Sequence, residues 1–135
     1  MKGVILAGGT GSRLSPITDV TNKHLLPVGK KPMILHLVEK LVDSNIKDIM
    51  VITGTEHMGD IVSLLGSGKN LDCSFTFRVQ DEALGIAHAL LLAQDFVGES
   101  SVVVALGDNM FEDSLDEYLK KYQTEKKSCF LILKK

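Results

Sequence analysis

The stretch of sequence that decides the fold is the first part of the chain, Gly3-Val4-Ile5-Leu6-Ala7-Gly8-Gly9-Thr10-Gly11-Ser12-Arg13-Leu14. Residues 4–7 form a short apolar run, which is typical of a strand buried on both faces. The run leads directly into three glycines within four residues. Glycine lets a ligand approach the backbone, successive N–H groups can surround an anion, and the guanidinium of Arg13 adds further donors. The stretch therefore predicts a strand followed by a loop that binds a polyphosphate.

Two widespread phosphate-binding motifs do not fit the spacing of this loop. The dinucleotide fingerprint requires a third glycine that opens a helix, but Leu14 stands at that position. Pro16 also disfavours helical geometry at the residue before it. The P-loop requires Gly-Lys-Ser/Thr after four spacer residues, and this sequence is missing here. Taken alone, the loop leaves two interpretations open, a phosphate site and a plain tight turn.

The rest of the chain alternates apolar strands with helices. Pro32 suits the first turn of a helix, residues 34–42 carry apolar side chains at helical spacing, and residues 73–79 alternate as an edge strand does. We also expect a long connection at 8–31, buried strands at 49–52 and 102–106, a short helix with Ile61, Leu64 and Leu65 facing inward, helices at 83–96 and 115–122, and a last strand at 129–133. This order predicts an α/β fold, with a three-layer, Rossmann-like, mainly parallel sheet that carries helices on both faces.

Composition and charge narrow the class of protein. The 135 residues fit one domain, and a content of 44% hydrophobic and 24% charged residues is typical of soluble globular proteins. The net charge of −2 gives no basic field for nucleic acid, and no apolar run approaches the ~20 residues of a membrane span. Because the apolar run begins almost at once, we expect no signal peptide, and Cys73 and Cys129 lack metal-ligand spacing. We expect a cytoplasmic protein with buried free thiols and no nucleic-acid or membrane partner.

Polar and glycine residues follow the ends of three expected strands, at 8–13, 80–85 and 107–109. Because ligands of such sheets lie beyond the carboxyl ends of the strands, we expect these clusters to converge on one site. The Gln80 amide offers a donor and an acceptor to the edge of a base, and Asp108 is a carboxylate of the kind that holds Mg²⁺ beside phosphates. A surface polar residue and a turn residue are the alternatives at these two positions.

The four histidines of the chain show no ligand spacing. They are His24, His36, His57 and His88. Two of them fall in helical patterns and two in loops or at a helix start, so we expect no catalytic or metal-binding role for any of them.

Residues 4–34 carry a longer composite pattern, which reads Leu-Ala-Gly-Gly-x-Gly-x-Arg-Leu, Pro-x-Thr, Lys-x-Leu-Leu-Pro-Val and Lys-x-Pro-Met-Ile. On this pattern the chain resembles the N-terminal part of the nucleoside-diphosphate-sugar pyrophosphorylases. Asn22-Lys23-His24 is similar to the branch that transfers thymidylate to glucose 1-phosphate. The resemblance covers the whole chain, whereas members of the family continue well past its last strand. We therefore expect residues 1–135 to be the nucleotide-binding part of a truncated sugar-nucleotidyltransferase domain.

The resemblance implies roles for particular residues. Arg13, Lys23 and Asp108 form the catalytic group: Arg13 holds the β- and γ-phosphates, Lys23 reaches the α-phosphate and the sugar phosphate, and Asp108 binds Mg²⁺. Asn109 lies beside the sugar phosphate, and Gln80 and Gly85 bind the base. The implied nucleotide-binding set is Leu6, Ala7, Gly8, Gly9, Thr10, Gly11, Ser12, Arg13, Lys23, Gln80, Gly85 and Asp108.

The implied reaction makes dTDP-glucose and pyrophosphate from dTTP and glucose 1-phosphate, with Mg²⁺ as cofactor. The residues between Gln80 and Gly85 depart from the usual thymidylyl pattern, so UTP, CTP and other sugar 1-phosphates stay open as substrates. A non-catalytic nucleotide-binding or assembly module is a second alternative. A dinucleotide oxidoreductase is a distant third, because Leu14 and the long loop disagree with it. The last strand lacks its later neighbours, and its edge suits pairing in a homo-oligomer.

Overall fold

The centre of the protein is a parallel sheet of four strands. A computed structural model describes residues 1–9 and 21–125. The strands stand in the order β5-β4-β1-β6 and all neighbours are parallel, with Gly3 of β1 opposite Ile49 on one side and Val103 on the other. Their bounds are Lys2–Ala7 for β1, Asp48–Thr53 for β4, Ser74–Val79 for β5 and Val102–Leu106 for β6. The first apolar stretch therefore lies in the middle of the sheet, and residues 74–79 lie at an edge, as expected.

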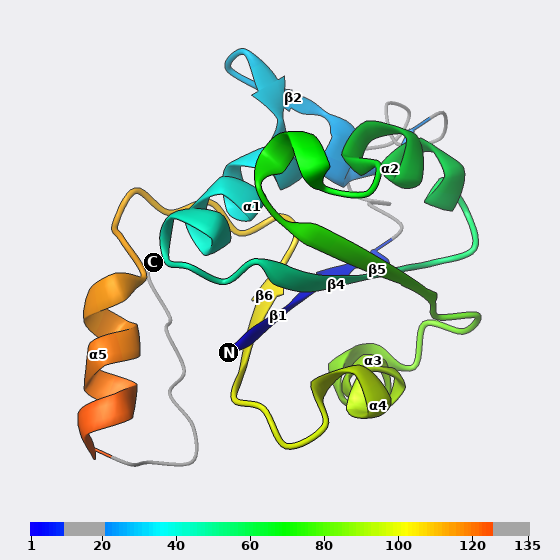
Figure 1. Cartoon of the computed structure of the whole chain (residues 1–135). Coiled ribbons are helices and arrows are strands. Elements are labelled where there is room, and N and C mark those ends of the chain that lie inside the picture. The colour runs from blue at the N-terminus through cyan, green and yellow to red at the C-terminus, as the bar shows by residue number, and fades with distance from the viewer. Residues whose placement is uncertain (10–20, 126–135) are drawn as a thin grey trace.

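Helices cover both faces of this sheet (Figure 1). Helices α1 (Met33–Asp43) and α2 (Met58–Leu65) lie on one face, and α3 (Gly85–Leu92) and α4 (Gln94–Val97) lie on the other. Helix α5 (Asp116–Glu125) follows β6, and Leu115 at its start belongs to the core on the α1 side. The three-layer α/β arrangement predicted from the sequence is confirmed.

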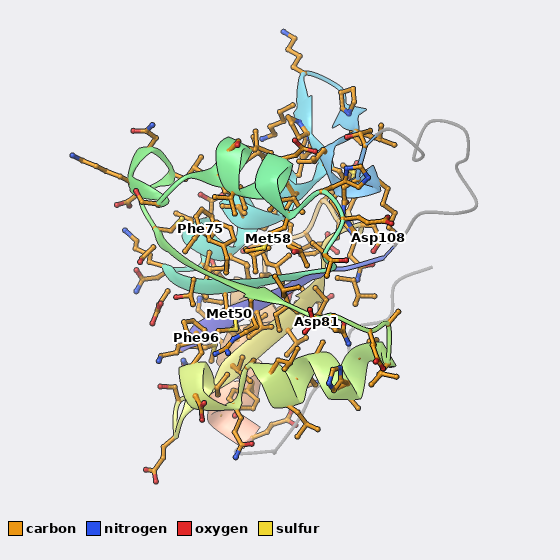
Figure 2. The ribbon with its side chains drawn as sticks, turned by 90° about the vertical axis from the view of Figure 1, so that its right-hand side faces the viewer. Met50, Met58, Phe75, Asp81, Phe96 and Asp108 are labelled. Carbon is orange, nitrogen blue, oxygen red and sulfur yellow. The ribbon has the colours of Figure 1, made fainter. Side chains whose placement is uncertain are left out.

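The sheet has an apolar core on each face because strand residues alternate in direction. Ile5 packs among the buried side chains of α1, whereas Val4 packs with Met50 on the face covered by α3 and α4. In Figure 2, Met50 and Phe96 lie on one side of the sheet and Phe75 on the other. Each large aliphatic side chain buried in this way contributes about 1.5–3 kcal/mol. The helical spacing of residues 34–42 correctly predicted the buried face of α1, formed by Ile34, Leu37, Val38 and Leu41.

The prediction of one continuous apolar helix at residues 83–96 is wrong. The chain forms α3 and α4 instead, which meet at Ala93. Gly85 has a φ of +86°, a conformation that favours glycine, so the helix begins there rather than at residue 83. Much of α3 also faces solvent, and its exposed apolar side chains are Leu84 at the cap, Ile86, Leu90 and Leu91.

The prediction that residues 102–106 form a fully buried strand is also wrong. β6 lies at the end of the described sheet, and Val102 and Val104 are 38% and 39% exposed. Val103 and Ala105 point to the α1 side and are packed against its core. The opposite face stays open because α3 and α4 pack over β1 and β4 instead.

Several smaller expectations need correction. Within residues 8–31, the described part contains the 3₁₀ helix η3 (Lys23–Leu25) and an antiparallel pair, β2 (Pro27–Val28) and β3 (Lys31–Pro32), so this connection is partly regular. Leu64 is 37% exposed, because Ile61 and Leu65 occupy the inward stripe of α2. A second 3₁₀ turn, η4 (Lys69–Leu71), precedes β5.

Cys73 lies just before β5 and is a half-buried free thiol rather than a fully buried one. Burial and the neighbouring Asp72 raise the pKa of this thiol, so it is a poor nucleophile. Cys129 and the expected strand at 129–133 lie outside the described residues. Within the described part, none of the helices has the length and apolar character to span a membrane.

Candidate active site

The described parts of the three strand-end clusters come together at the carboxyl ends of β1, β5 and β6. A Cβ placed on Gly8 would lie 3.6 Å from Gln80 Oε1, and one on Gly9 would lie 3.5 Å from Lys23 Cε. Asp108 lies in the turn that follows β6 and contacts Lys23. The convergence expected from the topology is therefore present. Thr10, Gly11, Ser12 and Arg13 lie outside the described residues, and their roles stay predictions.

The chemical centre of this region is an ion pair between Lys23 and Asp108. Lys23 Nζ lies 2.5 Å from Asp108 Oδ2, and the two side chains are 22% and 37% exposed. Burial alone would raise the pKa of Asp108, but the hydrogen bond and the charge of Lys23 outweigh it and hold that pKa below its usual value. The pair thus presents a negative and a positive group to one ligand, side by side.

A buried pair, Asn22 and His24, anchors the turn that carries Lys23. The Asn22 amide donates to the carbonyl of Ala7 at 3.3 Å, and its oxygen accepts the backbone N–H of His24 at 2.9 Å. The same oxygen contacts His24 Nδ1. Both side chains are buried, with 6% and 2% exposed. The end of β1 therefore holds the turn from which Lys23 projects.

The His24 ring also fits against the end of β6. A Cβ on Gly107 would lie only 2.7 Å from His24 Cδ2, and Gly107 N–H donates to the carbonyl of Leu6. Burial, aided by the charge of Lys23 and opposed by Asp108, lowers the pKa of His24 to about 4. At neutral pH the ring is uncharged and packs beneath the Lys23–Asp108 pair. The sequence reasoning missed this role; the signal present was asparagine two residues before histidine, the spacing of a local side-chain-to-backbone turn.

Gln80 occupies the exit of the edge strand. Its N–H donates to the carbonyl of Thr53 at 2.7 Å, which fixes the backbone against the end of β4. Its amide Nε2 donates to the carbonyl of Gly85 at 3.2 Å and lies 3.0 Å from His88 Nδ1. Figure 2 shows Asp81, the next residue, toward the same right-hand side of the sheet as Asp108. His88, for which we expected no role, is thus a direct neighbour of the predicted base-binding residue.

A comparison with known proteins assigns the family. The sequence profile described as nucleotidyl transferase matches residues 2–135. The chain belongs to the nucleotidyl transferase family. The glucose-1-phosphate thymidylyltransferase of Neisseria meningitidis is 44% identical to this nucleotidyl transferase chain over 111 residues, which are 82% of the chain and 38% of that protein.

Solved structures agree with this assignment. A Bacillus anthracis protein provisionally assigned as a glucose-1-phosphate thymidylyltransferase, in complex with sucrose, is 63% identical with a TM-score of 0.91 over 93% of this chain and 51% of that one. A UDP-glucose pyrophosphorylase complexed with UDP-glucose is 25% identical with a TM-score of 0.74, over 93% and 54%. The expected family and fold are confirmed. The chain spans about two-fifths to a half of the length of these proteins.

The described part of the nucleotidyl transferase chain contains no group of three or more histidine, cysteine, aspartate or glutamate side chains placed to hold a metal ion. Mg²⁺ bound with a nucleotide takes one or two carboxylates and completes its shell with phosphate oxygens and water. Asp108, a half-exposed carboxylate kept ionised, fits a nucleotide-bound ion of this kind. It does not fit a metal site built from protein ligands alone.

The nucleotidyl transferase chain also has a surface hollow of about 800 Å³ between α1 and residues 109–113. Asn109 lines it, together with charged side chains that include Glu39 and Lys40. Gly8, Gln80 and Lys23 do not line this hollow. The cluster at the strand ends, rather than the hollow, is therefore the candidate active site, and the contact of Asn109 with a sugar phosphate stays a prediction.

Proposed function

We propose that the chain is the nucleotide-binding part of an Mg²⁺-dependent enzyme that makes dTDP-glucose and pyrophosphate from dTTP and glucose 1-phosphate. The observation that carries the proposal is the Lys23–Asp108 pair beside the glycines that end β1. Two relatives support it, since a 44% identical and a 63% identical protein bear the thymidylyltransferase name, the second provisionally. Residues 1–135 act in this proposal as one unit that supplies the triphosphate half of the site.

In the proposed reaction, a phosphate oxygen of the sugar 1-phosphate forms a bond to the α-phosphorus, and the bond from that phosphorus to the pyrophosphate oxygen breaks. Such a transfer depends on positioning and charge neutralisation more than on acid–base groups. The buried Asn22–His24 pair anchors the turn that carries Lys23, so the Lys23 ammonium group is held beside Gly9. From there it neutralises charge on the two phosphates that must approach each other. Arg13 would hold the departing β- and γ-phosphates.

Asp108 is the residue that we assign to Mg²⁺. When bound, the ion would draw charge from the phosphates and orient them, as metal ions do in phosphoryl transfer. The Asp108 carboxylate is ionised at neutral pH, and Lys23 lowers its pKa further, so this metal ligand needs no deprotonation. Gln80 lies beside Gly8 and contacts Gly85, and we assign these two residues to the base.

Two alternatives rest on particular findings. Transfer of a uridylyl group is favoured by the structural likeness to a UDP-glucose pyrophosphorylase complexed with UDP-glucose. A non-catalytic nucleotide-binding module is the second alternative, because the Lys23–Asp108 pair beside the glycines would suffice to bind a triphosphate. In that case the strand-end site would bind a triphosphate without turnover.

The test is a panel of pyrophosphate-release assays with four triphosphates and several sugar 1-phosphates. It uses this chain and a chimaera that adds the remaining half of the Bacillus anthracis relative. We expect dTTP with glucose 1-phosphate to give the highest rate in the chimaera, and dTTP to raise the melting temperature of the chain alone. A faster reaction with UTP would favour uridylyl transfer. Binding without pyrophosphate in both proteins would favour the non-catalytic module, and no thermal shift with any triphosphate would overturn the proposal.

A further inference from the structure

Among the described residues, the amide group of Gln80 is held through its nitrogen only. Its nitrogen, Nε2, faces the first turn of α3, where it lies 3.2 Å from the Gly85 carbonyl and 3.0 Å from His88 Nδ1. Gly85 and His88 are three residues apart, so they stand on neighbouring positions of the same helix face. The first turn of α3 therefore contacts one atom, Gln80 Nε2, through two groups.

The chemistry of these two partners defines which end of the amide faces them. A backbone carbonyl accepts and never donates, so the amide atom beside Gly85 is the nitrogen. His88 Nδ1 accepts as well when the ring carries its proton on Nε2, and the two acceptors then match the two N–H bonds of the amide. With His88 in this tautomer, a flip of the amide would place Oε1 against two acceptors and would lose both hydrogen bonds.

The amide oxygen points in consequence toward the glycine end of β1. Oε1 lies 3.6 Å from the position that a Cβ would take on Gly8, and it accepts no hydrogen bond from any residue within 1–9 and 21–125. A ligand in the strand-end site would thus meet an acceptor from Gln80 and no donor. Thymine and uracil carry an N–H at ring position 3, whereas cytosine carries an acceptor there and donates only through its 4-amino group. An amide oxygen that faces ring position 3 therefore selects the first two bases.

We propose that His88 is a positioning residue that locks the Gln80 amide with its oxygen toward ring position 3 of the base, so that the site accepts a base with an N–H there and rejects cytosine. This inference rests on the proposed function, because it requires a nucleotide at the strand ends. It narrows the substrate class to thymine and uracil nucleotides. It also involves α3 in recognition of the base, since this helix supplies both groups that orient the Gln80 amide.

Removal of the His88 ring leaves one hydrogen bond at 3.2 Å to hold the amide. A neutral hydrogen bond contributes about 1 kcal/mol, which corresponds to roughly a fivefold change in an equilibrium constant. The flipped amide, which presents its donor to the ligand, then becomes accessible, and the preference for dTTP over dCTP falls. If His88 only stabilised the fold, its removal would weaken the binding of dTTP and dCTP equally.

The experiment measures dissociation constants of dTTP and dCTP by calorimetry, since the two share one sugar. It compares the 135-residue chain with His88→Ala, with His88→Gln, whose amide oxygen restores an acceptor, and with Leu91→Ala, a control on the same helix that is 67% exposed in the parent chain. The side-chain amide resonances of Gln80, recorded by NMR without nucleotide, give a second readout.

We expect His88→Ala to lower the dTTP preference about fivefold and to shift the Gln80 amide resonances, and we expect His88→Gln and Leu91→Ala to retain the parent ratio. An unchanged ratio in His88→Ala would overturn the role of His88 and leave the proposed function intact. Unchanged Gln80 resonances in His88→Ala would likewise overturn it. Absence of binding by either nucleotide to the parent chain would overturn both proposals together.

Discussion

Lys23 and His24 are neighbours in the sequence but lie in opposite environments. The Lys23 side chain is 22% exposed and reaches Asp108, whereas the His24 residue is 2% exposed and lies under that pair. The short turn of η3 separates the two side chains, and Asn22 ties the turn to the end of β1. The buried, uncharged His24 ring therefore gives the turn a rigid support, and the charged Lys23 side chain projects from this turn toward Asp108.

Replacement of Lys23 by alanine tests the reactive group. In the chimaera described above, Lys23→Ala should lower turnover by about 10²–10³, the usual cost of losing one preorganised charge contact. The affinity for dTTP should change less, because backbone N–H groups and Arg13 would still hold the triphosphate. Steady-state kinetics and calorimetry separate the two quantities. Unchanged turnover would remove Lys23 from the mechanism.

The low pKa of His24 predicts a dependence of stability on pH. In the unfolded chain the ring takes up a proton below pH 6.5, but in the folded chain it does so only near pH 4. The free energy of unfolding should therefore fall as the pH drops from 6.5 toward 4, by up to about 3 kcal/mol. Urea unfolding at pH 7 and pH 5 measures the effect. His24→Gln should flatten this dependence, and an equal slope in both proteins would contradict the assignment.

At the scale of the elements, the end of β6 and the turn η3 fit together without spare space. Gly107→Ala would place a Cβ 2.7 Å from the His24 ring and should lower the free energy of unfolding by about 1–3 kcal/mol, as overpacking does. Gly59→Ala in α2 is a matched control, because a Cβ there meets no atom within 4 Å. Chemical denaturation compares the two variants. A loss of stability equal in both would show that the contact at Gly107 is unimportant.

The sequence predicted the elements whose apolar pattern is strong. β1 and β4 are continuous apolar runs, and α1 carries a regular stripe, so local pattern and buried position agree. The divided helix was not predictable in this way, since every residue from 86 to 93 is compatible with one helix. Its start depends on the positive φ of Gly85, which the surrounding fold imposes. The exposure of β6 likewise depends on which strands α3 and α4 cover.

The candidate site was predictable only where topology decides it. Ligands lie at the carboxyl ends of parallel strands, and this rule predicts from the sequence alone that Gly8, Gln80 and Asp108 lie close together. The partners that orient them could not be found in the same way. His88 contacts Gln80 only through the fold, and a lone histidine in a helix carries no signal for this. For His24, the asparagine two residues earlier was the one local signal.

At the scale of the whole molecule, the outer side of α3 and the open face of β6 expose a set of apolar side chains. Leu91 is 67% exposed, the largest value among the exposed large hydrophobic side chains of the described chain. Leu91→Lys should therefore leave the free energy of unfolding within about 0.5 kcal/mol and should lower the binding of an apolar dye to the folded protein. Ala89→Lys, at a residue that is 3% exposed, should unfold it. A large destabilisation by Leu91→Lys would show that this side chain is covered.

The central position of β1 also has a consequence for how the protein is made. Lys2 pairs with Val102, a hundred residues later, and Gly3 pairs with Ile49. A ribosome therefore releases β1 before either of its neighbours, and the second neighbour emerges about a hundred residues later. Long chain segments must close before that pairing forms, which slows folding and leaves an unpaired apolar strand exposed to other nascent chains. For this topology, the speed of translation and the supply of chaperones bear directly on the yield of native protein.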